Sequence, residues 1–553
     1  MTSDTEPAAP ASVLTEAPER YFGAAIWGEL PGGGEIDRPS PGRPGAARSR
    51  VAAARLRTTL PVFLVLALAT FLRFFQLDRV GFNSDEAVYT GTAASLAGNE
   101  TLRSMFPVFR AHPLLLQILL SLGMHGEVSD YSARAVTAAI GVATVLATYA
   151  LGRRLYDHRV GLLAALILAV MPYSVVVSRQ VLLDGLMTLG ATLVLYCVAR
   201  YVESAELPWM LASCALMGAT VLAKETSIVL VGGLYAFFAL TPSVRLRMRH
   251  VGLGGLVMLL VITAFPLALS LSGRASSGQH YLLWQLFRRS NHGRLFYAQV
   301  LPTVIGPLVL LLAVLGLVLF RRHNTWRERL LLTWLAAPVV FFTLWPVKGF
   351  QYLLPVAPVL AVLAARTIAR VDTLEWLRER GRAVAGGAGY LVALVVVLSL
   401  VVPTWSRIEP SGSRTYLAGT GGLPGGREAG RWLRDNVPAS AQLLAIGPSM
   451  ANVLEFYGQR RVYALSVSPD PANRNPSYQP VPNPDLAMRQ ARFQYLVWDS
   501  YTASRSPSFG AKLTALVSKY HGVAVFTGTV RVRAASGRGV DAPVVVIYRV
   551  RPT

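Results

Sequence analysis

Cysteine and charge are both scarce in this chain. Only two of its 553 residues are cysteine, Cys197 and Cys214, and both fall inside apolar stretches. No disulfide framework is therefore indicated, and cysteine does not reveal the redox compartment. Charged residues make up 15% of the chain and hydrophobic residues 53%. This balance excludes an ordinary soluble enzyme, and apolar runs of roughly 17 to 25 residues predict a polytopic α-helical membrane protein.

The N-terminal region lacks the apolar run of a signal peptide. Residues 1–57 are rich in Pro, Gly, Ala and Glu. We expect a disordered cytoplasmic tail there and no cleaved signal.

The formal net charge of +23 would suggest nucleic acid as the partner of a soluble domain. Much of the arginine, however, lies in short loops between apolar stretches. The charge is therefore a signal of membrane topology, and no nucleic-acid partner is expected.

Eleven apolar stretches are expected to cross the membrane. They lie near residues 60–75, 134–152, 160–177, 184–202, 207–222, 226–241, 251–271, 302–320, 329–345, 352–368 and 386–403. Cytoplasmic loops are enriched in Lys and Arg. Arginine clusters within 48–57, 153–159, 245–249, 321–329 and 366–382 all fall on one side of this arrangement. We therefore expect a multi-pass protein of the cell membrane, with the N-terminus inside and the C-terminus outside.

The segment Pro113–Leu120 has two interpretations. It is apolar but short, which suits an interfacial or re-entrant helix and leaves residues 76–132 as one long outer loop. The alternative is a true crossing, which would invert the side of every later loop. The three arginines between residues 153 and 159 favour the first interpretation.

Beyond Trp405 the composition changes. β-type patches at 442–446, 493–498, 523–526 and 544–548 alternate with helical stretches at 426–436 and 508–520. Residues 406–553 are therefore predicted to form an extracytoplasmic α/β domain, beside a transmembrane catalytic domain of residues 58–405. The C-terminal part contains no GxGxxG, P-loop or zinc spacing. An accessory or acceptor-recognition role is expected for it.

The predicted topology gathers charged groups on the outer side. Two single residues are His112 and Arg134. The others belong to motifs or loops: Asp85 and Glu86 to SDEAVY, Arg179 and Asp184 to SRQVLLD, Lys224 and Glu225 to LAKETS, Lys348 and Tyr352 to KGFQY, and the remaining basic residues to the loop Arg274–Arg294. Each alone could be a solvated loop charge or an interfacial anchor. Arg134, Asp184 and Lys224, however, adjoin apolar spans, where uncompensated charge is costly. A shared polar cavity is therefore predicted.

Such a cavity suits transfer of a group from a lipid-linked phosphate. A carboxylate can take the proton from an acceptor hydroxyl. Arg and Lys can stabilise the charge that builds on a leaving phosphate.

An ordered set of motifs resembles a known superfamily. The motifs are SDEAVY after the first span, AHPL at Ala111–Leu114, ARAV at the start of the second span, SRQVLLD, LAKETS and KGFQYLLPVAP. In their order along the chain, and in the side of the membrane on which each is expected, they resemble the motifs of the glycosyltransferase C superfamily. The resemblance is specifically to bacterial relatives of protein O-mannosyltransferases and of the lipid A aminoarabinose transferase. The family often has His-Pro-Pro where this chain has His112-Pro113-Leu114, a departure that bears on the role of His112.

The resemblance implies a role for each candidate residue. Asp85 would be the catalytic base, Glu86 would orient the acceptor or a metal, and Asp184 would be a second essential carboxylate. The donor phosphate would be bound by Arg134, Lys224 and Lys348, with Tyr352 in support. His112 and Arg179 would be neighbours of the site.

The resemblance also implies the substrates. The donor would be a polyprenyl-phosphate sugar used at the outer face with inversion of the anomeric centre. The acceptor would be a protein, polysaccharide or lipid hydroxyl among the membrane lipids. The resemblance indicates no definite cofactor. Whether a divalent cation is bound stays open, because the sequence shows no recognisable set of metal ligands.

Two other classes of function compete with a transferase. A transporter or flippase of polyprenyl-linked sugars would have broken helices and intramembrane charges, but the two halves show no internal repeat and the Asp-Glu loop would be unexplained. A sensor that binds through the outer α/β domain would not account for the clustered charges.

Overall fold

The computed structural model describes residues 44–109, 112–124, 128–273, 280–281, 284–288, 290–379, 382–409, 422–533 and 539–551. The chain forms two units, residues 1–58 and 59–553. Residues 1–43 of the expected tail lie outside the described residues, as do Ala111 of the AHPL motif and Arg274 and Arg289 of the basic loop.

The expected disorder does not extend to residue 57. Helix α1 spans Pro44–Phe74, so residues 44–57 are helical. The reason is local: proline suits the first position of a helix, and the Ala- and Arg-rich sequence that follows has high helix propensity.

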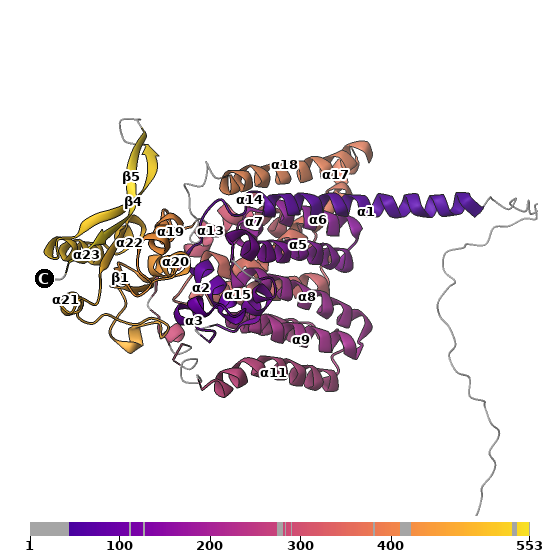
Figure 1. Ribbon diagram of the computed structural model, residues 1–553. Coiled ribbons are helices and arrows are strands. Elements are labelled where there is room, and N and C mark those ends of the chain that lie inside the picture. Colours follow the sequence, from indigo (N-terminus) through magenta and orange to yellow (C-terminus); the bar gives the residue numbers. More distant parts are fainter. Residues whose placement is uncertain are drawn as a thin grey trace, which may run out of the picture. The chain divides into compact units, whose positions relative to one another are not determined.

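Apolar helices make up most of the second unit (Figure 1). Five described helices are long and apolar enough to cross a membrane: α5 (Asp130–Leu155), α8 (Leu183–Ser204), α11 (Met248–Leu271), Phe350–Thr373 and Gly387–Ile408. Two bent pairs raise the number to seven, α6 (His158–Val170) with α7 (Pro172–Ser178), and α13 (Phe296–Ile305) with α14 (Pro307–Leu319). Shorter apolar helices cover Thr59–Phe74, Leu207–Ala223 (α9) and Glu225–Leu240, and α15 spans Trp326–Leu344. Each expected span coincides with one of these elements, and the predicted polytopic helical fold is confirmed.

The segment around Pro113 does not cross. Three short helices follow the first span: α2 (Ser84–Leu96), α3 (Glu100–Met105) and α4 (Leu115–Ser121). The 7 residues of α4 extend only about 10 Å at 1.5 Å per residue, against a hydrocarbon core of about 30 Å. The interpretation in which this segment does not cross the membrane is therefore the one the structure supports.

The bend between α6 and α7 is stabilised by a buried arginine. Pro172 has no N–H and breaks the span with a bend of 60°, which leaves the preceding carbonyls without helical partners. Arg73 of α1 donates from Nη1 to the carbonyl of Ala169 (3.1 Å) and from Nη2 to that of Leu168 (3.4 Å). Thr404 Oγ1 donates to the carbonyl of Val170 (2.7 Å). These donors replace the missing helical bonds where water is absent.

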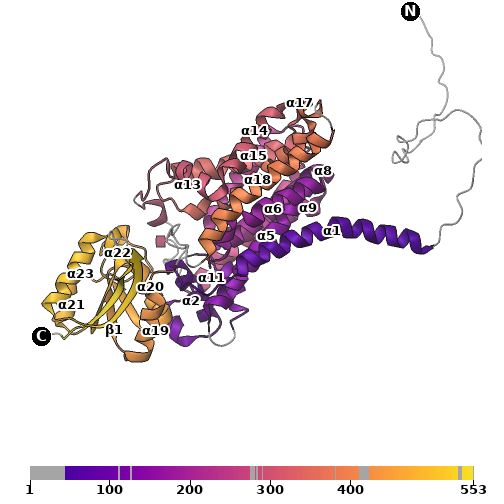
Figure 2. The ribbon, with the colours of Figure 1, turned by 90° about the horizontal axis from the view of Figure 1, so that it is seen from above.

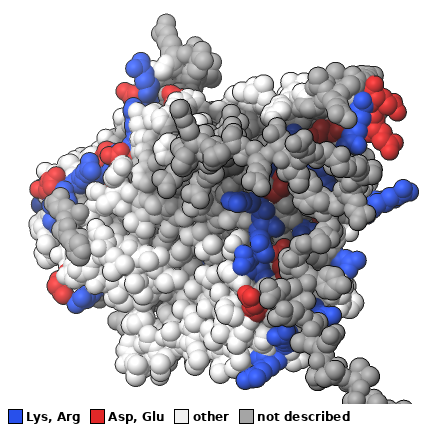
Figure 3. All heavy atoms as spheres, turned by 90° about the vertical axis from the view of Figure 1, so that its right-hand side faces the viewer, with Lys and Arg blue, Asp and Glu red and all other residues white. Residues whose placement is uncertain are grey.

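The two ends of the bundle carry different groups. Arg154 at the end of α5 pairs with Glu203 at the end of α8, and Arg159 pairs with Asp372 (2.8 Å). These arginine-rich turns therefore lie together, and Figures 1 and 2 place α2, α3 and the sheet at the opposite end. Figure 3 views the end with the turns and shows Lys and Arg side chains gathered beside a wide uncharged area.

The C-terminal region contains one sheet of five described strands in the order β2-β1-β3-β5-β4. The strands are β1 (Gln442–Ala445), β2 (Arg461–Ala464), β3 (Tyr495–Asp499), β4 (Val523–Arg533) and β5 (Gly539–Arg549). β1 pairs in parallel with β2 and β3, with Leu444 opposite Leu496, and β5 runs antiparallel to β3 and β4. The predicted α/β region is thus confirmed, although β2 was not anticipated.

Helices cover this sheet: α19 (Gly426–Asn436), α20 (Pro448–Gly458), α21 (Pro484–Arg489), α22 (Ser500–Arg505) and α23 (Pro507–Lys519). Leu443, Leu444 and Ala445 of β1 are all fully buried. An uninterrupted apolar run is typical of a parallel strand that is covered on both faces.

The C-terminal region is attached to the first loop. The Tyr457 hydroxyl donates to Asp130 Oδ1 (2.8 Å) and accepts from the backbone N–H of Phe82 (2.8 Å). Arg427 Nη1 lies 3.1 Å from Asp130 Oδ2, and Asn452 Nδ2 donates to Ser84 Oγ (2.9 Å). The sheet-containing region and the helices consequently belong to one compact unit.

Candidate active site

The N-terminus of α2 presents Asp85. Asn83 caps the helix, because its side-chain oxygen accepts from the N–H groups of Asp85 (2.9 Å) and Glu86 (3.0 Å). Glu86 Oε2 accepts in return from the N–H of Asn83 (3.0 Å), which completes a capping box. The cap directs the Glu86 side chain inward, where it is 1% exposed, while Asp85 is exposed.

Glu86 and Arg134 form a buried bidentate ion pair. Arg134 Nε lies 2.7 Å from Glu86 Oε1, and Arg134 Nη2 lies 2.8 Å from Glu86 Oε2. The N–H of Val181 also donates to Glu86 Oε1 (3.1 Å). Glu86 therefore fixes α2 to α5 and to the segment before α8, and its oxygens face protein donors.

Arg134 has no N–H group left for a donor phosphate. Its remaining donors bond to the carbonyls of Leu77 (2.9 Å), Val80 (2.6 Å) and Gly81 (3.0 Å), so all five guanidinium hydrogens are used. The expectation that Arg134 contacts the donor is not supported. An arginine at the start of a span is equally able to close the loop that precedes it, and the sequence does not distinguish the two roles.

Arg179 also bonds to the protein backbone. Its Nη1 donates to the carbonyls of Leu72 (3.0 Å) and Arg73 (3.2 Å) at the end of α1. Burial, and secondarily the charge of Arg134, lower the pKa of Arg179 to about 10. The group thus caps a helix C-terminus, where a cation is favourable, and it is not part of the charge cluster.

Asp184 and Lys224 come together as expected. Asp184 lies in the first turn of α8 and Lys224 directly follows α9. The Lys224 Nζ donates to Asp184 Oδ1 at 2.7 Å, and it lies 4.3 Å from the centre of the Tyr352 ring. Both charged side chains are buried, at 8% and 3% exposed. A buried pair of this kind is held by mutual attraction against a large desolvation cost.

His112 is held by Glu225, a member of the predicted polar cavity to which no individual role was assigned. His112 Nδ1 lies 3.1 Å from both carboxylate oxygens of Glu225. His112 Nε2 lies 3.0 Å from the hydroxyl of Tyr281. The ring therefore has a partner on each nitrogen, Glu225 on Nδ1 and Tyr281 on Nε2.

Asp85 stands among these pairs. Burial by the surrounding protein raises the pKa of the Asp85 carboxyl, the positive charges of His112 and Lys224 lower it, and Asp184 and Glu86 raise it. Asp85 is nevertheless exposed to solvent. We call the water-accessible space at Asp85 the recess, and the net effect of these groups is a carboxyl whose pKa is raised above its usual value.

Tyr89 and Tyr501 lie within electrostatic range of Asp85, and Tyr281 contacts His112. Burial first, and Asp85 second, raise the pKa of Tyr89 well above its usual value. Burial raises the pKa of Tyr501 in α22, Arg505 lowers it, and Asp85 raises it again. Tyr501 thus brings the C-terminal region within electrostatic range of Asp85. Tyr89 ends the SDEAVY motif but was given no role, and no motif marked Tyr281 or Tyr501, whereas Glu225 was recognisable as the acidic neighbour of Lys224.

Lys348 lies outside this cluster. Its Nζ donates to the carbonyl of Trp345 (2.7 Å), and its backbone pairs with the side chain of Asn291 (2.8 and 2.9 Å). Within the described residues no carboxylate lies within salt-bridge distance of Lys348. The ammonium caps the C-terminus of α15, four residues before Tyr352.

The side chains do not provide a clear metal site. Among the described residues no group of three or more His, Cys, Asp and Glu side chains could hold a metal ion. Asp184 and Glu225 are each occupied by a cation, Lys224 and His112. We therefore derive no step through a metal.

Comparisons with known proteins agree with this architecture. Residues 111–267 match a family model described as dolichyl-phosphate-mannose-protein mannosyltransferase. ArnT from Cupriavidus metallidurans in the apo state is similar, with a TM-score of 0.65 at 18% identity over 88% of this chain and 97% of that one. The same protein bound to undecaprenyl phosphate gives a TM-score of 0.62 at 16% identity, with the same shares covered. The chain has the glycosyltransferase C fold.

A third similar structure extends the comparison to archaea. It is the oligosaccharyltransferase AglB from Archaeoglobus fulgidus in complex with an inhibitory peptide and a dolichol-phosphate, with a TM-score of 0.57 at 15% identity over 88% of this chain and 74% of that one. A search of curated protein sequences finds no significant match. The glycosyltransferase C resemblance of the sequence motifs is thus confirmed for the fold, and the family match covers the segment from the AHPL motif through LAKETS.

Proposed function

We propose that this chain is a membrane glycosyltransferase that moves a sugar from a polyprenyl-phosphate donor to an acceptor hydroxyl. The observation that carries the proposal is Asp85, a water-accessible carboxylate with a raised pKa among His112, Lys224 and Asp184. A general base works best when its pKa lies nearer the working pH. Among the carboxylates of this cluster, Asp184, Glu225 and Glu86 are each engaged with a cation, and Asp85 is exposed.

The proposed reaction is one displacement with inversion. The acceptor oxygen forms a bond to the anomeric carbon while the bond from that carbon to the phosphate oxygen breaks. The acceptor proton passes to Asp85, and the bonding electrons leave with the polyprenyl phosphate. Asp85 regains its charge by releasing the proton to water in the recess.

Lys224 is the cation best placed for the leaving phosphate. Its ammonium has three hydrogens, and Asp184 accepts one of them. The other two can serve a phosphate beside Tyr352, where low exposure strengthens the attraction. Lys348 was expected to contact the same phosphate, but its ammonium bonds to the carbonyl of Trp345 outside the cluster, so Lys224 is the cation that we propose for this role.

The relatives support a polyprenyl donor. ArnT is described bound to undecaprenyl phosphate and AglB in complex with a dolichol-phosphate. The many exposed apolar side chains on the spans, such as Phe63, Leu64 and Leu271, provide the lipid-facing surface along which a polyprenyl chain would approach.

We further propose that the recess opens at the extracytoplasmic side. The arginine-rich turns and the Asp85 cluster lie at opposite ends of the bundle, and short arginine-rich turns favour the cytoplasm. Residues 1–57 would then be cytoplasmic and residues 406–553 extracytoplasmic.

A flippase remains the second candidate because the spans contain breaks. Both bent pairs, at Pro172 and at Gly306, resemble the broken helices of transporters. The carbonyls before Pro172, however, accept hydrogen bonds from Arg73 and Thr404. These bonds stabilise the break in one conformation, so it does not require a transport function.

One assay separates the two functions. Membranes containing the full chain are given polyprenyl phosphates that carry radiolabelled mannose or arabinose, together with protein, polysaccharide and lipid fractions of the cell envelope. The transferase is supported if label appears in an acceptor fraction with wild type and is lost with Asp85→Asn. Label that changes leaflet but stays on the polyprenol in both proteins would contradict the transferase.

A further inference from the structure

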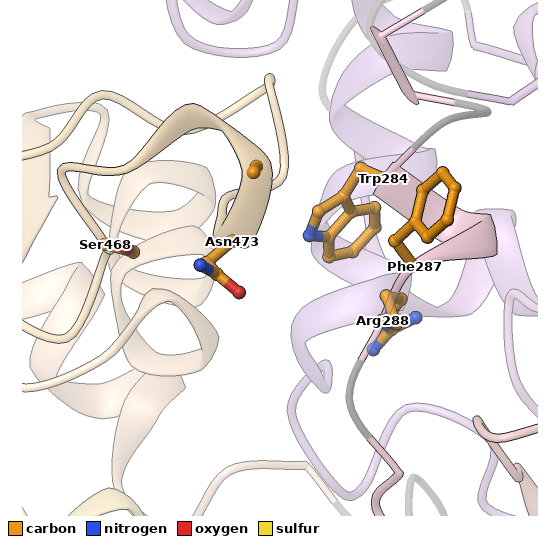
Figure 4. A pocket seen from close by; sticks show the side chains of 6 residues that line it. Trp284, Phe287, Arg288, Ser468 and Asn473 are labelled. Carbon is orange, nitrogen blue, oxygen red and sulfur yellow. The ribbon is translucent and has the colours of Figure 1, made fainter.

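A pocket of about 390 Å³ lies between the segment that precedes α13 and the C-terminal region. Its lining residues are Trp284, Phe287 and Arg288 from the loop before α13, and Ser468, Ala472 and Asn473 from the C-terminal region. Figure 4 shows the two walls, with Asn473 across the gap from the Trp284 indole. The expected roles of Asp85 and its neighbours do not use this pocket.

The lining combines aromatic faces with small polar groups. Phe287 is 76% exposed, so its ring is available to contact a ligand in the pocket. The Arg288 guanidinium lies 4.5 Å from the centre of the Trp284 ring, which holds the indole in place. Ser468 and Asn473 add a hydroxyl and a carboxamide on the opposite wall.

This combination matches the chemistry of a sugar ring. One face of a pyranose or furanose presents C–H groups that pack on an aromatic ring, and its edge presents hydroxyls that bond to amides and hydroxyls. Pockets that bind small molecules pair apolar walls with a few placed polar groups in this way.

A hydrogen-bonded chain joins the pocket to the recess. Arg288 Nη1 donates to Gln285 Oε1 (3.1 Å), and Gln285 Nε2 donates to the Tyr281 hydroxyl (2.6 Å). That hydroxyl lies 3.0 Å from His112 Nε2. Gln285 and Tyr281 thus connect the pocket to His112, whose charge contributes to the electrostatic environment of Asp85.

We propose that this pocket is a sugar-binding subsite, with the ring against Trp284 and its hydroxyls toward Ser468 and Asn473. The inference rests on the proposed function and deepens it. The ring could be the sugar of the donor or a sugar unit of a glycan acceptor, and both have the chemistry described.

Binding can be measured without turnover. The purified full chain in detergent is mixed with methyl α-mannopyranoside and with methyl β-arabinofuranoside, and saturation transfer to the ring protons is recorded by NMR. We expect transfer to at least one glycoside with wild type, and a loss of about tenfold in affinity with Trp284→Ala, corresponding to one lost aromatic face. Trp284→Phe should retain binding in part.

Controls separate the pocket from folding and from catalysis. Asn473→Ala should weaken binding, whereas Asn436→Ala, an exposed asparagine of α19 away from the pocket, should not. Asp85→Asn should bind as wild type does. If Asp85→Asn kept full transfer, the proposed base would be wrong while the subsite could still be measured.

Kinetics identify the source of the sugar. In Trp284→Ala, a raised KM for the polyprenyl-phosphate sugar assigns the subsite to the donor, and a raised KM for a glycan acceptor assigns it to the acceptor. The subsite is overturned if neither glycoside shows saturation transfer with wild type, or if Trp284→Ala and Asn473→Ala bind and turn over unchanged.

Discussion

Lys224 and Asp184 form a buried ion pair, with Nζ 2.7 Å from Oδ1, across the ends of two neighbouring helices. The pair lies beside Asp85, whose carboxyl responds to both charges. Lys224 therefore serves two acids at once, and a third anion, the donor phosphate, would compete for the same ammonium. Lys224 would therefore be shared between Asp184 and the phosphate of the proposed donor.

Asp85→Asn should remain folded and inserted but lose transfer. The amide preserves size but cannot take the acceptor proton, and loss of a general base typically lowers a rate by about 10²–10⁴-fold. The measurement is transfer of labelled sugar by membranes matched for protein content. Asp78→Asn, an exposed carboxylate of the same loop, is the control and should be active. Near-normal turnover of Asp85→Asn would remove it as the base.

Transfer should be lost as the pH falls, at a higher pH than an ordinary aspartate would give. The base acts when deprotonated, and burial raises the pKa of Asp85. His112→Gln removes a charge that lowers this pKa, so the acid limb of kcat/KM should move further toward neutral pH. A limb that does not move, measured between pH 4 and 8 with a stable enzyme, would contradict the coupling of His112 to Asp85.

Lys224→Met should destabilise the protein as well as inactivate it. Removing one partner leaves Asp184 buried without its counter-charge, which typically costs about 3–5 kcal/mol. The double variant Lys224→Met/Asp184→Leu removes both charges and should recover the Tm in detergent, but it should not recover transfer. If the double variant regained activity, the pair would be structural only.

Glu86→Gln should lower the stability of the protein. Both oxygens of Glu86 face protein donors, and the neutral amide would leave the Arg134 charge buried without a partner. We expect a loss of about 3–5 kcal/mol, seen as a lower Tm and less inserted protein. The KM for the donor should change little in the fraction that folds. A normal Tm with a raised donor KM would instead return Arg134 and Glu86 to the site.

The C-terminal region should lie outside the cytoplasmic membrane. An alkaline phosphatase fused after Thr553 should be active, and a green fluorescent protein in the same place should be dark, because the sheet lies at the end opposite the arginine-rich turns. A fusion after Arg245 in an arginine-rich turn should give the reverse pattern and serves as the control. A dark phosphatase at Thr553 would mean that the orientation is inverted.

The sequence by itself determined the membrane fold and the placement of most elements. Apolar runs set the helices, because buried or lipid-facing backbone must satisfy its own hydrogen bonds. The runs QLLAI and FQYLVW set two central strands. Asp85 and the neighbours Lys224 and Glu225 were visible as charges beside spans, since such charges are costly unless they are used.

The partners of those charges were decided only by the tertiary structure. The sequence separates Arg134 from Glu86 by 48 residues and His112 from Glu225 by 113. No local sequence pattern shows which helix ends come into contact. Arg134 was therefore expected at the donor, whereas it lies against Glu86. The Trp284 pocket has the same origin: its two walls come from distant segments, and packing of the C-terminal region on the first loop brings them face to face.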